Sequence, residues 1–92
     1  MKNLEQLEKK GALSALHFLY ENQSKEWMIT ELLDRIDCSQ RALYSAIQRL
    51  HQLGLIQQIR KPEFNRRYIG LTDKGKAVAR KLREVVEMLE DG

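Results

Sequence analysis

The sequence predicts a mainly α-helical domain with one small β-hairpin. Apolar residues recur at helical spacing along most of the chain, and two short strand-like stretches flank a polar turn near residue 60. One proline and five glycines leave little material for long loops. The predicted order is helix, short strand, helix, helix, strand, strand, helix. Ninety-two residues suffice for one hydrophobic core, so we expect a single domain over residues 1–92.

The first predicted helix spans residues 3–22 and has two apolar faces. Leu4, Leu7 and Phe18 lie on one face, and Leu16 lies on the other. One face can cover the core of a small domain, which leaves the other for a second subunit.

Residues 27–29 are predicted to form a short strand that enters the second helix. Thr30 is the expected N-cap of that helix, and Glu31 lies in its first turn, where the helix dipole favours an acid.

The third predicted helix, residues 40–53, has one apolar and one polar face. Ser39 is its expected N-cap, and Gly54 is the expected left-handed residue at its end. The apolar face consists of Leu43, Ala46, Ile47, Leu50 and Leu53. The polar face has no acid and consists of Arg41, Tyr44, Ser45, Gln48 and Gln52. These groups suit hydrogen bonds to base edges and phosphates, and a plain solvated surface is the alternative.

Positive charge is concentrated between residues 39 and 71, which hold six basic residues and one acid, whereas the whole chain has a net charge of +3. Four of these bases bracket the turn of the predicted hairpin, namely Arg60, Lys61, Arg66 and Arg67. Such a patch indicates a surface that meets a polyanion, with a merely solubilising hairpin as the alternative. Asn65 is either a turn residue or a contact, and Arg49 faces either a phosphate or an acid.

The last predicted helix, residues 72–90, begins at Thr72 and carries a long apolar stripe. The stripe consists of Val78, Leu82, Val85 and Leu89, and only its first two members are near enough to the hairpin to join the core. The far end, with Val86, needs another surface to cover it, and a second subunit is the favoured one. Mixed charges on the polar face disfavour a helix lying on a membrane.

Composition argues against several classes of function. The chain has no apolar run of the ~20 residues that a membrane span needs and no apolar signal region, so we expect a cytoplasmic protein without a membrane partner. Two distant histidines and one cysteine supply neither a metal site nor a catalytic set, so we expect no metal, no cofactor and no enzyme activity. Cys38, in the turn before the third helix, is either a small buried hydrophobe or a redox-sensing thiol.

Two segments, ITELLDRIDCSQRALYSAIQRLHQLGLIQQ and RRYIGLTDKGK, carry a family resemblance. Over about residues 13–82 the chain resembles the winged helix-turn-helix transcriptional regulators of prokaryotes, in the neighbourhood of the MarR and PadR families. The resemblance implies that residues 40–53 are a recognition helix in the major groove and that residues 60–67 are a wing on the backbone or minor groove. It also implies dimerisation through the first and last helices.

Together these observations predict a homodimeric regulator that binds specific sequences of double-stranded DNA. The predicted DNA contacts are Ser39, Gln40, Arg41, Tyr44, Ser45, Gln48, Arg49, Arg60, Lys61, Asn65, Arg66 and Arg67. The predicted dimer contacts are Leu4, Leu7, Phe18, Leu82, Val85, Val86 and Leu89. The alternative is a winged-helix module that binds another protein in a larger complex. The sequence leaves open the operator, the sign of regulation, any small-molecule effector and which terminal helix forms the dimer.

Overall fold

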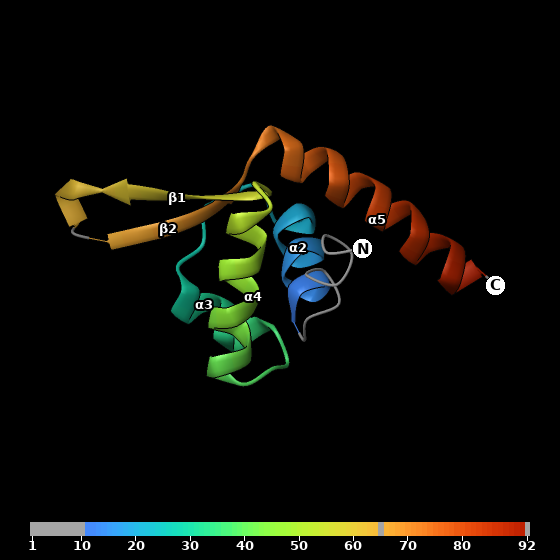
Figure 1. The fold of residues 1–92 in the computed structure, drawn as a ribbon, viewed down its shortest axis with the longest axis horizontal. Coiled ribbons are helices and arrows are strands. Elements are labelled where there is room, and N and C mark those ends of the chain that lie inside the picture. Colours follow the sequence, from blue (N-terminus) through green and yellow to red (C-terminus); the bar gives the residue numbers. More distant parts are fainter. Residues whose placement is uncertain (1–10, 65, 92) are drawn as a thin grey trace.

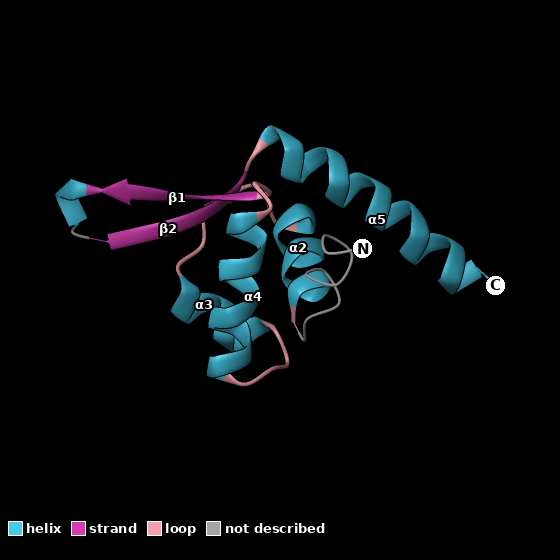
Figure 2. Cartoon of the chain, in the orientation of Figure 1, coloured by secondary structure: helices cyan, strands magenta, loops and turns pink. Residues whose placement is uncertain are grey.

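The computed structural model describes residues 11–64 and 66–91, and Figures 1 and 2 show their arrangement. The helices are α2 (Ala12–Glu21), α3 (Ile29–Arg35), α4 (Gln40–Gln52) and α5 (Asp73–Asp91). The strands are β1 (Ile56–Lys61) and β2 (Arg66–Leu71), with the short 3₁₀ helix η1 (Pro62–Phe64) between them. The predicted fold class is confirmed. No helix among the described residues combines the length and the apolar composition that crossing a bilayer requires.

Gly11 separates α2 from the residues before it. Its backbone φ of +89° is left-handed, so the single helix predicted over residues 3–22 does not run through this position. A Cβ here would lie 3.4 Å from the sulfur of Cys38, which is an ordinary contact distance, so the left-handed backbone is what favours glycine at this position. The prediction was wrong here because apolar spacing does not reveal a left-handed residue. Leu4 and Leu7 lie outside the described residues.

The N-cap of α3 is Met28, and the predicted cap at Thr30 was wrong. The backbone N–H of Met28 donates a 2.9 Å hydrogen bond to the carboxylate of Glu31, which reaches back over the first turn. Lys25 donates a 2.8 Å bond to the other oxygen of the same carboxylate. The bond from Lys25, and then the one from Met28, lowers the pKa of Glu31 below its ordinary value.

Both ends of α4 carry the predicted caps. The side-chain oxygen of Ser39 accepts a 3.1 Å hydrogen bond from a backbone N–H in the first turn. Gly54 has a φ of +76°, and its N–H donates to the carbonyl of His51 at 3.0 Å. The N–H of Leu55 donates to the carbonyl of Leu50, also at 3.0 Å. These two bonds form a Schellman motif, which ends the helix and turns the chain directly into β1.

The core lies between α2, α4 and the base of the hairpin. Its largest fully buried side chains are Leu16, Leu32, Leu43 and Leu50. Phe18 and Trp27 pack edge to face with their ring centroids 5.0 Å apart. The indole N–H of Trp27 donates a 2.9 Å hydrogen bond to the carbonyl oxygen of Asn22. Phe18, which we predicted to contact a second subunit, therefore has an aromatic partner within its own chain.

The first half of α5 is anchored to the body of the domain. The hydroxyl oxygen of Thr72 accepts a 2.9 Å hydrogen bond from the N–H of Gly75, which confirms the predicted cap. A Cβ on Gly75 would lie 1.8 Å from the carbonyl oxygen of Leu55, so only glycine allows the helix to come this close. Val78 and Leu82 are partly buried against the core, as expected.

The second half of α5 projects away from the other helices, on the opposite side of the molecule from the hairpin tip (Figure 1). Val85, Met88 and Leu89 are 50%, 73% and 76% exposed. The expectation that the far end of the stripe is uncovered within one chain is therefore met.

Candidate nucleic-acid interface

The polar face of α4 is open to solvent along the helix. Arg41, Tyr44, Ser45 and Gln48 are all exposed. The apolar face is buried at Leu43, Ala46, Ile47 and Leu50. The predicted division of this helix into two faces is confirmed. Because the buried face is packed into the core, the polar side chains project from a fixed element, as a recognition surface requires.

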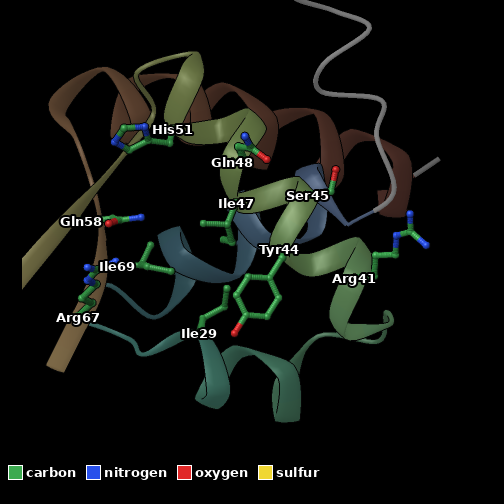
Figure 3. A pocket seen from close by; sticks show the side chains of 10 residues that line it. All are labelled: Ile29, Arg41, Tyr44, Ser45, Ile47, Gln48, His51, Gln58, Arg67 and Ile69. Atoms are coloured by element: carbon green, nitrogen blue, oxygen red, sulfur yellow. The ribbon is translucent and has the colours of Figure 1, made fainter.

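An open groove of about 650 Å³ lies between the polar face of α4 and the hairpin (Figure 3). Its lining is Ile29, Arg41, Tyr44, Ser45, Ile47, Gln48, His51, Gln58, Arg67 and Ile69. Three isoleucines, from α3, α4 and β2, give the groove an apolar part. The lining has two guanidinium groups and no carboxylate among its described residues. The groove therefore suits a ligand that is anionic and partly apolar, which describes a sugar–phosphate strand.

The pairing register of the hairpin divides its basic residues between two faces. Arg60 pairs with Arg67, and Lys61 pairs with Arg66. Side chains alternate along a strand, and directly paired residues share a face, so the first pair and the second pair point in opposite directions. Ile69 lies two residues after Arg67 on the same face and also lines the groove. The four bases, treated above as one cluster, are thus a pair facing the groove and a pair facing away.

Lys61 is engaged on the face that points away from the groove. Its Nζ lies 3.2 Å from a carboxylate oxygen of Glu26 and 4.6 Å from the centroid of the Tyr68 ring. Both partners belong to the same chain. The Lys61 ammonium is therefore paired with a carboxylate and an aromatic ring even without a ligand.

The remaining predicted contacts occupy different places. Ser39 and Gln40 are exposed where α4 begins. Arg49 is only partly exposed, and its buried Nε has no hydrogen-bond partner within the part of the chain that the structure describes. Asn65, at the hairpin turn, lies outside the described residues. Cys38 is partly buried and packs against the core.

Two polar residues of the groove, His51 and Gln58, escaped the sequence analysis. His51 follows Tyr44 and Gln48 at helical spacing, so the periodicity of the polar face contained this signal. Gln58 needed the pairing register, because only its pairing with Ile69 shows which face of β1 it occupies.

No protein-family model and no curated protein matches the chain. Among solved structures, AF1382 from Archaeoglobus fulgidus is 18% identical, with a TM-score of 0.76 and coverage of 95% of this chain and 96% of that one. MepR, a transcription regulator of the Staphylococcus aureus multidrug efflux pump MepA, is 19% identical, with a TM-score of 0.79 over 98% of this chain and 67% of MepR. A transcriptional regulator homologue from Pyrococcus horikoshii OT3 is 20% identical, with a TM-score of 0.73 over 100% and 97%.

The fold is a winged helix-turn-helix. The predicted resemblance to winged helix-turn-helix proteins is confirmed at the level of the fold. In this fold α3 and α4 are the helix-turn-helix, and the β1–β2 hairpin is the wing.

Proposed function

We propose that this protein binds specific sequences of double-stranded DNA as a homodimer and regulates transcription. The observation that carries the proposal is the groove, which brings the acid-free polar face of α4 together with Arg67 and the adjacent wing face. The similar solved structures include proteins named as transcription regulators, which supports the same function. Enzyme activity has no such support from them.

In the proposed complex, α4 lies in the major groove and reads base edges. Arg41 offers a two-pronged donor suited to guanine, and Gln48 offers a donor and an acceptor suited to adenine. Tyr44, which is 47% exposed, provides an aromatic surface for a thymine methyl group. Ser39, Gln40 and the N–H groups at the start of α4 lie where a helix N-terminus favours a phosphate. Ser45 and Arg49 complete the proposed set on this helix.

The wing would bind the DNA backbone through Arg60 and Arg67 on its groove face. Arg66 and Asn65 are the other predicted wing contacts. One sugar–phosphate strand would cross the groove, with deoxyribose against the isoleucines and phosphates against the guanidinium groups. If each subunit neutralises about three or four phosphates, the log–log salt slope of a dimer should be near −6.

The far end of α5 supplies the proposed dimer surface. Leu82, Val85, Val86 and Leu89 form the apolar seam, and the exposed Met88 lies at its edge by helical spacing. The charges of α5 are segregated: after Asp73 its first half carries only bases, Lys74, Lys76, Arg80, Lys81 and Arg83, and its second half carries only acids, Glu84, Glu87, Glu90 and Asp91. Acids at a helix C-terminus oppose the helix dipole, so bases from another subunit beside them would be stabilising. Within α5 itself, Glu84 pairs with Lys81 and Glu87 pairs with Arg83. An antiparallel pair of α5 helices would place each acidic half beside the basic half of the other subunit.

Selection from a pool of random duplexes at two salt concentrations tests this function. The proposal predicts enrichment of a two-fold-symmetric motif whose half-sites are about 34 Å, one helical turn, apart. Salt-sensitive retention without any motif would contradict sequence specificity. No retention even at low salt would contradict DNA binding and would favour a module that binds an acidic protein surface.

A further inference from the structure

The ion pair between Lys61 and Glu26 joins the wing to the segment that precedes α3. Glu26 comes directly before Trp27, whose backbone pairs with Ile69 as an isolated antiparallel bridge. Trp27 therefore shares the groove side with Ile69, and alternation places Glu26 on the opposite face. Lys61 and its second partner, Tyr68, lie on that same opposite face by the register of the hairpin. Lys61 on β1, Tyr68 on β2 and Glu26 in the segment before α3 thus lie on the same side of the wing.

The wing needs support because it extends beyond the core. Figure 1 shows the hairpin projecting from the helices, and a two-stranded ribbon alone is marginally stable in water. Burial falls along it, from Ile56 and Leu71, which are buried at the base, to Arg60 and Arg67, which are exposed near the tip. Among the described residues, the backbone hydrogen bonds that join the wing to the body nearest the tip are those between Ile69 and Trp27.

Lys61 provides an attachment farther along the wing. Ile69 pairs with Gln58, and Lys61 is three residues beyond Gln58 toward the tip, which is about 10 Å along an extended strand. The Lys61 side chain returns across the Tyr68 ring to Glu26. Lys61 is partly buried, whereas Arg66, its cross-strand neighbour, is exposed.

We propose that Lys61 and Glu26 are positioning residues that hold the wing at the angle at which Arg60 and Arg67 meet DNA. This inference rests on the proposed function. In this proposal Lys61 does not contact a phosphate. It acts through the two arginines on the other face. Two roles that the sequence merges into one basic cluster are thus separate: Arg60 and Arg67 meet the DNA, and Lys61 fixes their orientation.

Comparison of Lys61→Met with Arg67→Met on a selected duplex distinguishes these roles. Methionine keeps an apolar stem over Tyr68 and removes the charge. Since an exposed ion pair and a cation–π contact together are modest, we expect Lys61→Met to weaken binding by roughly five-fold per subunit. Its log–log salt slope should match the wild type, because no phosphate contact is lost. Arg67→Met should reduce the slope by about one per subunit. Arg35→Met, at an exposed base of α3 that does not line the groove, controls for the loss of one positive charge.

A charge exchange supplies the decisive readout. Glu26→Lys and Lys61→Glu should each weaken binding, and the double variant should return to within about two-fold of the wild-type affinity, because the reversed pair can form again. Two results together would overturn the proposal: a log–log salt slope of Lys61→Met as small as that of Arg67→Met, and no recovery of affinity in the double variant. Lys61 would then be a phosphate contact.

The positioning role can also be measured without DNA. ¹⁵N relaxation of the free protein should show larger fast motion of the β1 and β2 amides near the tip in Lys61→Met than in wild type or Arg67→Met. Unchanged relaxation would contradict the proposal. If the wild type bound no duplex, the proposed function would fail while this comparison still decided whether Lys61 holds the wing.

Discussion

Trp27 and Ile69 exchange two backbone hydrogen bonds, of 3.1 Å from the N–H of Trp27 and 2.7 Å from the N–H of Ile69. The segment before α3 thereby becomes a partner of the wing. The Trp27 ring is buried and packs against Phe18 of α2. One residue thus connects the first described helix, the helix-turn-helix and the wing, so the placement of the wing relative to α4 depends on it.

Replacement of Trp27 should destabilise the whole domain. Trp27→Ala should lower the free energy of unfolding by about 3–5 kcal/mol, because it leaves a large cavity beside Phe18. Trp27→Phe should lower the free energy of unfolding through its smaller ring. It should lower it by about 1 kcal/mol more because the indole hydrogen bond to the Asn22 carbonyl is lost. Urea unfolding measures both. Tyr44→Ala, at an exposed aromatic residue, should change the free energy of unfolding by less than about 0.5 kcal/mol. Equal effects of the two alanine variants would contradict the structural role of Trp27.

Gln48 should contribute to sequence preference. We expect Gln48→Ala to weaken binding to the selected duplex by roughly 1–3 kcal/mol and to leave binding to random duplex unchanged, because a base contact carries sequence information and a phosphate contact does not. Competition titrations with the two duplexes measure the difference. Gln57→Ala is the matched control, since Gln57 is an exposed amide on the wing face that points away from the groove. Equal losses for both variants on both duplexes would exclude base reading by Gln48.

Val85 should control the oligomeric state. Val85→Glu adds a charge to the apolar seam of α5 and extends a run of acids, so we expect monomers where the wild type is dimeric. Val85 is 50% exposed within one chain, and the helical content should therefore stay the same. Sedimentation equilibrium and circular dichroism measure the two properties, with Val85→Ala as a control that keeps the seam apolar. If Val85→Glu stays dimeric, the dimer surface does not include this part of α5.

Glu31 should make stability depend on pH in the acid range. Its pKa in the folded protein is lowered from an ordinary value of 4.5, first by the bond from Lys25 and then by the bond from Met28. Its ionised form therefore stabilises the fold above pH 4.5, and this contribution is lost as the pH falls through the lowered pKa. Glu31→Gln should be less stable than wild type at pH 7, and the gap should shrink at pH 3. A gap of constant size would show that the Glu31 carboxylate has no such role.

The features that the sequence predicted well are local ones. Ser39, Gly54 and Thr72 end or begin helices through bonds to neighbours within a few residues, or through a backbone angle that glycine adopts freely. The two faces of α4 follow from a period that holds along any regular helix. The error at Gly11 arose because apolar spacing does not reveal a left-handed backbone angle, and the error at Thr30 arose because the longer side chain of Glu31 closes the first turn of α3 at Met28.

The features that the sequence could not predict depend on contacts between distant segments. Arg60 and Lys61 are neighbours in sequence, and only the pairing register shows that they face opposite ways. The partner of Lys61 is Glu26, which lies on the far side of α3 and α4 in the chain. The groove combines residues of α3, α4 and both strands. Its apolar part could therefore not be predicted from the pattern of basic residues in the sequence.

Amide chemical-shift mapping of the ¹⁵N-labelled protein during titration with a selected duplex tests the central claim most directly. We predict that the largest changes lie on the polar face of α4, at Arg41, Tyr44 and Gln48, and on the groove face of the wing, at Gln58 and Arg67. The exposed end of α5 should change little. Changes concentrated on α5, with the groove unaffected, would contradict the proposed interface.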